Sequence, residues 1–278
     1  MNLLTTKPLM ALRAHWPEYL IEAWAMGMFM ISAGVFTVLF EYPASPLNGA
    51  IHNADVRRVL IGVAMGLTAV MLIYSPWGQR SGAHMNPAVT LTFWRLGKVK
   101  GWDAVYYIIA QFIGGTVGVY IAWMILGVAF ASPQVNYVAT LPGDAGAGVA
   151  FIAETVISAL MMLMVLHVSN SSRARYTGVF AGVLVALFIS VEAPLSGMSI
   201  NPARSFASAF PLQQWNAFWI YLTAPVLGMQ LAAAIHGITR HQVNCAKLIH
   251  STTQRCIHCG FTPDDQRNIN PELSGAMS

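Results

Sequence analysis

The sequence predicts an all-α membrane protein in which six transmembrane helices and two re-entrant half-helices form an inverted repeat. Three observations support this fold class: the composition, six long apolar segments, and a short motif that occurs twice. Of the 278 residues, 56% are hydrophobic and 9% are charged, whereas a soluble domain is about 25% charged. This composition argues against a soluble enzyme, and it is too apolar for a disordered chain.

Six segments are long and apolar enough to cross a bilayer. A transmembrane helix needs roughly 20 mostly apolar residues to span about 30 Å. Because the number of predicted crossings is even, both termini are expected on the same side of the membrane. The six segments are 20–40, 57–75, 104–130, 147–169, 177–195 and 216–238.

The basic residues predict the orientation. Only Arg57 and Arg58 lie on the side opposite the termini, with Arg204 left out of the comparison. The positive-inside rule therefore predicts a multi-pass protein of the plasma or inner membrane with both termini in the cytoplasm. The net charge of +4 does not indicate nucleic acid, because no basic face or known binding motif is present. The residues on the side of the termini are Lys7, Arg13, Arg80, Arg95, Lys98, Lys100, Arg173, Arg175, Arg240, Lys247, Arg255 and Arg267.

Two of the connecting segments contain an Asn-Pro-Ala motif that opens a short apolar run. Asparagine is a favoured helix cap, and proline suits the first helical turn, so each run predicts a helix of two or three turns. At membrane depth such a half-helix is tolerated only where it packs against protein or lines a water-filled cavity. The motifs are Asn86, Pro87, Ala88 and Asn201, Pro202, Ala203.

The two halves of the chain match at nearly constant offsets. The Gly62-x-x-x-Gly66 pattern recurs 116 residues later, and the first Asn-Pro-Ala motif recurs 115 residues later. The copies cover about 16–130 and 147–240, within a channel domain of residues 1–240. Each copy holds three crossings, so the two must have opposite orientations. Inverted repeats with broken helices place their site near the midplane of the membrane.

The expected site is a meeting of the two half-helix N-termini. Each terminus carries roughly half a positive charge, and the amides of Asn86 and Asn201 would offer hydrogen-bond donors to the lumen. Arg204, about one turn beyond Asn201, adds a permanent positive charge. These features predict a passage that admits small neutral molecules and excludes protons and ions.

The loops at 81–90 and 196–206 closely resemble the two signature loops of the aquaporin, or major intrinsic protein, family, and Glu22, Gln111 and Glu154 fit the same pattern. The resemblance covers about residues 16–240. It implies six tilted helices with two half-helices, one pore per subunit, usually a homotetramer in the bilayer, and no cofactor for transport. It also implies that Asn86, Asn201 and Arg204 line the pore.

The resemblance further implies a selectivity filter of four positions: Met65, Ile189, Met198 and Arg204. Met65 occupies the first position if the loop before Asn86 contains one extra residue; otherwise Gly66 does. In the strict water channels of this family, the first position is Phe and the second is His. The Met, Ile and Met side chains here predict a less polar filter.

Water is the favoured substrate, with small neutral solutes also expected to pass. Ser205 directly after Arg204 resembles water channels, whereas glycerol facilitators place Asp there; a glycerol or ammonia facilitator is the alternative. An ion-coupled transporter with Glu22 and Glu154 as carriers is a third hypothesis. The resemblance instead favours both carboxylates as structural braces for the half-helix loops. No nucleophile and base constellation is apparent, so no enzyme is predicted.

Residues 241–278 are predicted to form a polar cytoplasmic tail. Cys256 and Cys259 have the two-residue gap of a zinc knuckle, and Cys245 with either His250 or His241 would complete a tetrahedral zinc site. A second Cys-x-x-Cys pair is missing. Three free thiols in a flexible tail are therefore the alternative to zinc binding.

Overall fold

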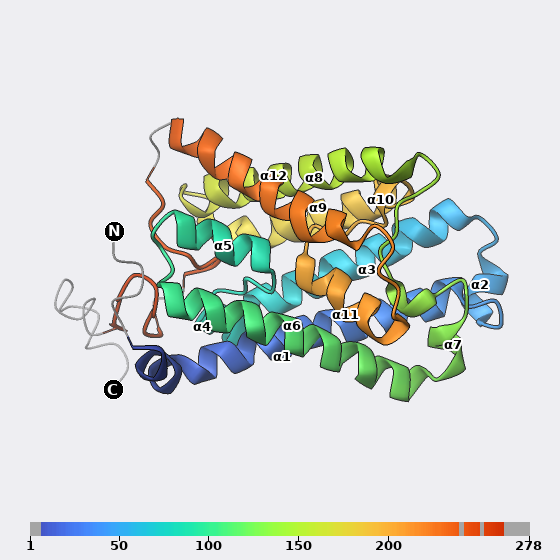
Figure 1. Cartoon of the computed structure of the whole chain (residues 1–278), viewed down its shortest axis with the longest axis horizontal. Coiled ribbons are helices and arrows are strands. Elements are labelled where there is room, and N and C mark those ends of the chain that lie inside the picture. The colour runs from blue at the N-terminus through green and yellow to red at the C-terminus, as the bar shows by residue number, and fades with distance from the viewer. Residues whose placement is uncertain (1–6, 239–241, 251–252, 264–278) are drawn as a thin grey trace, which may run out of the picture.

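The computed structural model describes residues 7–238, 242–250 and 253–263, and within these ranges the chain forms helices and connecting segments without a strand. Six of the described helices are long and apolar enough to cross a membrane, which confirms the predicted fold class. They lie side by side along the long axis of the molecule (Figure 1). They are α1 (Pro8–Glu41), α3 (Ala54–Tyr74), α6 (Gly101–Leu126), α8 (Gly146–Ser169), α9 (Thr177–Val191) and α12 (Phe218–Ile238).

Two helix ends differ from the prediction because of proline. Helix α1 begins at Pro8 instead of near residue 20, and it kinks at His15 (φ −129°), two residues before Pro17. Proline removes a helical hydrogen bond and clashes with the preceding turn. Helix α9 ends at Val191 instead of near 195, and a separate short helix containing Pro194 follows it.

The two predicted half-helices are α5 (Pro87–Arg95) and α11 (Pro202–Leu212), and they enter the bundle from opposite ends (Figure 1). Each begins at its proline, and the asparagine before it caps the helix. Asn86 accepts a hydrogen bond from the backbone N–H of Ala88 (2.9 Å), and Asn201 accepts one from that of Ala203 (3.0 Å). The local capping preferences thus fix where both half-helices start.

The inverted repeat is visible in how the helices pair. Helix α1 packs along α6, α8 packs along α12, and α3 crosses α9 between the two copies. A Cβ added to Gly66 would lie 2.4 Å from the carbonyl oxygen of Gly182, and one added to Gly182 would lie 2.6 Å from that of Gly66. Glycine at both positions therefore lets α3 and α9 approach closely.

Short helices complete the connections between these elements. They lie at the two ends of the bundle and around the half-helices (Figure 1). They are α2 (Pro46–Ala50), α4 (Pro76–Ser81), α7 (Val128–Ala131), η1 (Asn136–Val138), η2 (Ala174–Tyr176) and α10 (Ala193–Ser196).

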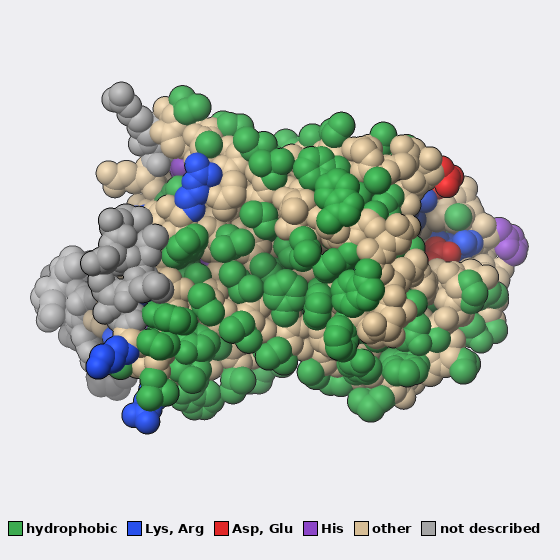
Figure 2. All heavy atoms as spheres, viewed as in Figure 1, with side chains coloured by type: hydrophobic (Ala, Val, Ile, Leu, Met, Phe, Trp, Pro, Cys, Tyr) green, Lys and Arg blue, Asp and Glu red, His purple; other side chains and the backbone are tan. Residues whose placement is uncertain are grey.

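The sides of the bundle are apolar, and the charged side chains gather at its two ends. Figure 2 shows hydrophobic side chains covering the face in view between these ends. A helix surface of this kind suits contact with acyl chains, because the lipid interior offers no partner for polar groups. Exposed apolar side chains occur on several spans, among them Leu67, Met71, Ile113, Met124 and Ile152.

Candidate functional site

The two asparagines meet in the interior of the bundle. The Nδ2 atom of Asn86 donates a hydrogen bond to the carbonyl oxygen of Ile200, and Nδ2 of Asn201 donates one to that of Met85, both at 2.7 Å. Each asparagine thus bonds the loop that precedes the other, so the N-terminal ends of α5 and α11 are joined. An amide nitrogen carries two hydrogens, and one on each asparagine is used in this way.

The loops before the half-helices share an unusual backbone conformation. Gly82 and Gly197 have φ of +106° and +81°, and Met85 and Ile200 both have φ of +48°. A side chain disfavours this left-handed region, which costs a non-glycine residue about 1–2 kcal/mol. The surrounding hydrogen bonds must therefore hold Met85 and Ile200 in place.

Glu22 on α1 supplies such bonds to the first loop. Its Oε1 accepts from the hydroxyl of Ser81 (2.7 Å) and from the backbone N–H of His84 (3.1 Å). Its Oε2 accepts from the backbone N–H of Met85 (2.6 Å) and from Nε2 of Gln111 (2.8 Å). The fully buried carboxylate thereby offsets its desolvation and orders the loop.

Glu154 on α8 does the same for the second loop. Its Oε1 accepts from the hydroxyl of Ser196 (2.7 Å) and the backbone N–H of Ser199 (2.6 Å), and its Oε2 accepts from the backbone N–H of Ile200 (2.7 Å). Glu154 is also fully buried. The two carboxylates therefore hold corresponding positions in the two copies of the repeat.

Two tyrosines donate hydrogen bonds to the same loops, a role that was not predicted from the sequence. The hydroxyl of Tyr107 donates to the carbonyl oxygen of Ser81 (2.7 Å), and that of Tyr221 donates to the carbonyl oxygen of Ser196 (2.6 Å). Tyr107 and Tyr221 are 114 residues apart, close to the repeat offset. That spacing was the available signal, but a tyrosine in an apolar span is typical of core packing as well.

Replacing Tyr221 with phenylalanine is expected to lower the free energy of unfolding by about 1 kcal/mol, because the change leaves the buried carbonyl of Ser196 without its donor. Tyr107→Phe should cost less, because the carbonyl of Ser81 keeps a second donor, Nε2 of His258 (3.1 Å). The exposed Tyr120, on the same helix as Tyr107, supplies the control Tyr120→Phe, which should be neutral. Thermal unfolding in detergent measures all three. Equal behaviour of the three variants would contradict this role.

A cavity of about 170 Å³ runs along the centre of the bundle. Asn86 and Asn201 line it, and the rest of its wall is largely apolar. Its lining residues on α3 extend over more than three turns, from Ile61 to Ile73 near the end of the helix. The neighbouring α9 contributes Val185 among others. The two half-helix ends thus meet at the wall of a single elongated space.

The four residues expected in a filter, Met65, Ile189, Met198 and Arg204, all line this cavity. Gly66 does not, because it faces Gly182 on α9. The segment from Gly66 to Asn86 is one residue longer than the corresponding segment from Gly182 to Asn201, since Gly66 precedes Asn86 by 20 residues and Gly182 precedes Asn201 by 19. The extra residue lies in the connection that contains α4.

Arg204 is the permanently charged side chain in the described lining of the cavity. Its backbone N–H completes the cap of α11 by donating to Oδ1 of Asn201 (3.3 Å). Its Nη1 donates to the carbonyl oxygen of Val138 in the long connection between α7 and α8 (2.7 Å). The guanidinium is thus held by a segment that belongs to neither half-helix.

The described part of the tail also reaches this cavity. Leu248 lines it, and its backbone N–H donates to the carbonyl oxygen of Gly82 (3.2 Å). The Nε2–H of His84 donates to the carbonyl oxygen of Ala246 (2.7 Å). The sequence carries no signal for these contacts, because they join residues more than 160 positions apart.

The structure brings Cys245, His250, Cys256 and Cys259 together. One ligand atom from each residue lies within 4.8 Å of all the others. The Cys245 thiol lowers the pKa of Cys256 by hydrogen bonding to its sulfur, and the same bond, together with burial, raises the pKa of Cys245. His241, the other histidine considered for this set, lies outside the described residues.

Comparison with known proteins agrees with this geometry. The profile of the major intrinsic protein family matches residues 11–236. The chain is 30% identical over 209 residues to the probable aquaporin NIP4-2 of Arabidopsis thaliana, covering 74% of this chain and 72% of that protein. It is 36% identical over 184 residues to aquaporin AqpM of Methanothermobacter thermautotrophicus, covering 63% and 74%.

The fold has a similar counterpart among solved structures, the aquaglyceroporin of Plasmodium falciparum. The TM-score is 0.66 at 16% identity, with 80% of this chain and 95% of that chain covered. At this identity the likeness concerns the fold. Together with the family profile over most of the chain, these findings establish that the protein belongs to the major intrinsic protein, or aquaporin, family of passive membrane channels, which are not enzymes.

Proposed function

We propose that this protein is a passive water channel that also passes small neutral solutes and excludes protons and ions. The observation that carries the proposal is the pair of asparagine amides, Asn86 and Asn201, at the wall of a cavity whose other lining is largely apolar. A polar solute crossing such a cavity finds side-chain hydrogen-bond donors mainly at Asn86, Asn201 and Arg204.

Each amide has one hydrogen beyond the bond to the opposite loop. That of Asn201 points to the weak acceptor Sδ of Met26 (3.6 Å), which a water oxygen would replace. A water oxygen that accepts from both would turn its own hydrogens away from the donors, which interrupts a chain of proton transfer. The N-terminal ends of α5 and α11 each add roughly half a positive charge at the same depth. These charges raise the energy of any cation, including a proton.

We infer that Met65, Ile189, Met198 and Arg204 form the filter. The three apolar side chains offer no hydrogen bond to a solute beyond a weak thioether, so Arg204 is the main donor. This supports passage of water together with neutral solutes such as glycerol or ammonia. The alternative, a glycerol or ammonia facilitator, rests on the same apolar filter. The relative flux of water and glycerol distinguishes a water channel from such a facilitator.

The transporter alternative has less support. Glu22 and Glu154 are both fully buried, and neither lines the cavity. Each oxygen of both carboxylates already accepts at least one hydrogen bond from a loop backbone N–H. A carrier must exchange protons or ions with the lumen, whereas these positions favour the structural role.

We further propose that the channel assembles as a homotetramer in the plasma or inner membrane, with both termini in the cytoplasm. The excess of basic residues at the end of the bundle that holds the described tail supports this orientation. The exposed apolar sides of the spans support contact with lipid and with other subunits. Chemical cross-linking in membranes measures the number of subunits.

Reconstituted protein is expected to increase the osmotic water permeability of vesicles without conducting protons, and Ile189→Trp is expected to abolish most of this increase. The indole would fill the lumen beside Arg204. Leu187 lies on the same helix but is 50% exposed on the outer surface, so Leu187→Trp should keep wild-type permeability. Stopped-flow light scattering measures both.

Gradients of glycerol and urea in the same assay distinguish a water channel from a solute facilitator. The proposed function would be overturned if wild type and the two variants Cys256→Ser and Leu248→Ala, which are expected to free the end of the cavity, were all no more permeable than protein-free vesicles. A block by Leu187→Trp as strong as that by Ile189→Trp would contradict the assigned lumen.

A further inference from the structure

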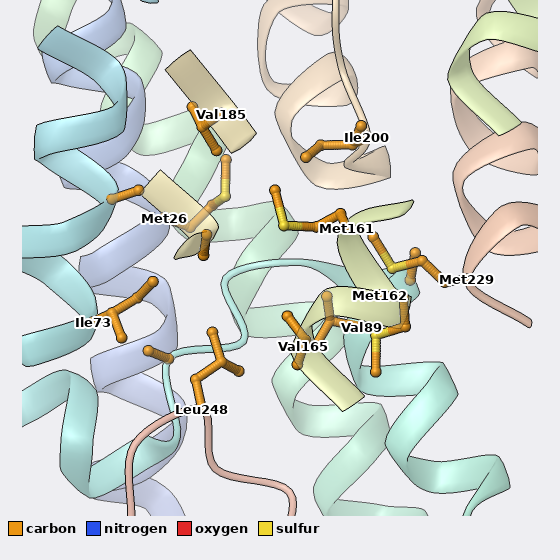
Figure 3. Packing of buried hydrophobic residues seen from close by; sticks show 14 of the residues in the cluster. Met26, Ile73, Val89, Met161, Met162, Val165, Val185, Ile200, Met229 and Leu248 are labelled. Carbon is orange, nitrogen blue, oxygen red and sulfur yellow. The ribbon is translucent and has the colours of Figure 1, made fainter. Parts of the chain in front are cut away.

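The described tail covers one end of the cavity. We call this end the inner mouth; it is lined by Ile73, Ala83, His84 and Leu248. Figure 3 shows Leu248 beneath the first re-entrant loop, with Ile73 on one side and Val165 on the other. Only 6% of Leu248 is exposed. Its side chain therefore occupies the space through which a solute would leave the lumen.

Three hydrogen bonds hold the tail to the first re-entrant loop. Two of them are the bonds of Leu248 to Gly82 and of His84 to Ala246. The third is donated by Nε2 of His258 to the carbonyl oxygen of Ser81 (3.1 Å). The rings of His84 and His258 also stack, with centroids 5.7 Å apart and planes 12° apart.

The covering segment has little regular structure of its own. Residues 242–250 and 253–262 contain turns and bends but no helix or strand. Ordering the backbone of such a segment is unfavourable, and the three hydrogen bonds to the loop offset part of that cost. The buried side chains of Val243, Ala246 and Leu248 anchor 242–250, and a cross-link to 253–262 would hold the two stretches together.

The cluster of Cys245, His250, Cys256 and Cys259 can supply it. Sγ of Cys245 lies 3.5 Å from Sγ of Cys256, and Nε2 of His250 lies 3.2 Å from Sγ of Cys259. In a tetrahedral zinc site with Zn–S of about 2.3 Å, the ligand atoms lie about 3.4–3.8 Å apart. The set of three thiolates and one imidazole is a standard structural zinc site.

The surroundings of the cluster suit a bound thiolate site. Cys256 and Cys259 lie in a tight turn, in which the backbone N–H of Gly260 (φ +79°) donates to the carbonyl oxygen of Cys256 (3.0 Å). Lys247 is 2% exposed, and its Nζ has no hydrogen-bond partner among the described residues. Three thiolates, one neutral imidazole and Zn²⁺ carry a net charge of −1, which the nearby ammonium of Lys247 balances.

We propose that Cys245, His250, Cys256 and Cys259 bind one Zn²⁺ and that the metal locks Leu248 across the inner mouth, so that zinc closes the channel. The closure rests on the proposed channel function, whereas the binding of zinc does not. Structural zinc contributes its binding energy to the folding of the segment that holds it. Removal of the metal therefore releases the tail and opens the inner mouth.

Metal binding is tested on the purified full-length protein under reducing conditions. We expect one zinc per chain, and Co²⁺ in its place should give the visible absorption of tetrahedral cobalt with thiolate ligands. Cys256→Ser and Cys259→Ser should lose both signals, while His52→Ala, a histidine exposed outside the cluster, should keep them. The proposal is overturned if the wild-type protein holds no stoichiometric zinc. It is also overturned if the channel closes through a Cys245–Cys256 disulfide instead of through zinc.

Closure is tested by water permeability in vesicles, with zinc or a chelator present on both sides. Wild type should be several-fold more permeable after chelation, whereas Cys256→Ser should stay at the higher value in both conditions. Leu248→Ala should also be open with zinc bound. Ile249 does not line the cavity, so Ile249→Ala should respond to zinc as wild type does.

The two proposals fail in different ways. If all variants match protein-free vesicles, the channel function fails and the closure fails with it, while the cobalt spectrum still reports the metal site. If Cys256→Ser and wild type are equally permeable in both conditions, the channel function stands and zinc-dependent closure is overturned.

Discussion

Glu22→Gln and Glu154→Gln are each expected to lower the free energy of unfolding by roughly 3 kcal/mol and to abolish most of the water permeability. Both carboxylate oxygens of each residue face a backbone N–H of the loop. A glutamine amide can present its oxygen to only one of them, so its NH₂ group must face the other donor. The loop residues at positive φ, Met85 and Ile200, then lose the bonds that hold them.

Glu41→Gln makes the same chemical change at the C-terminal end of α1. Glu41 accepts from Nη2 of Arg57 (3.0 Å), and its side chain is 23% exposed, so the loss should stay within about 1 kcal/mol. Thermal unfolding in detergent and stopped-flow permeability are measured for all three variants. If Glu22→Gln were as stable and as permeable as Glu41→Gln, the carboxylate would have no bracing role.

The half-helices were predictable from the sequence because their signals are local. Asparagine followed by proline fixes a helix start within two residues, and the structure begins α5 and α11 at Pro87 and Pro202. The repeat offset added the orientation, since three crossings per copy require inversion. The bracing role of Glu22 and Glu154 was expected from the resemblance to the aquaporin family, because the cost of a carboxylate in an apolar span by itself points to a functional role such as a proton relay.

The features that escaped prediction depend on contacts between distant parts of the chain. Met65 was predicted at the lumen with Gly66 as the alternative, and the sequence alone left that choice open because it does not say which side of α3 faces α9. The polar tail after residue 240 reads as separate from the channel. Its contact through Leu248 depends on the fold of the first re-entrant loop, which no local pattern encodes.

Arg204→Val is expected to raise proton and cation conductance by on the order of a hundredfold while leaving water permeability near that of wild type. A unit charge about 4 Å from a passing ion adds about 4 kcal/mol to the barrier for a cation at an effective dielectric constant near 20. The half-helix ends keep their own share of the barrier in the variant. The valine would also leave the carbonyl oxygen of Val138 with only a long contact (3.5 Å) from the hydroxyl of Ser208.

Arg204→Lys separates the charge of this residue from its shape. Lysine keeps the positive charge but not the planar fork that reaches Val138, so cation exclusion should largely persist while glycerol and urea fluxes rise. Arg173, exposed in the connection between α8 and α9, supplies the control Arg173→Val. A pH-sensitive dye inside the vesicles measures proton flux, and light scattering measures the solutes. The half-helix dipoles act in every variant. If Arg204→Val left proton exclusion unchanged, Arg204 would have no part in the barrier, and the whole barrier would lie at Asn86 and Asn201.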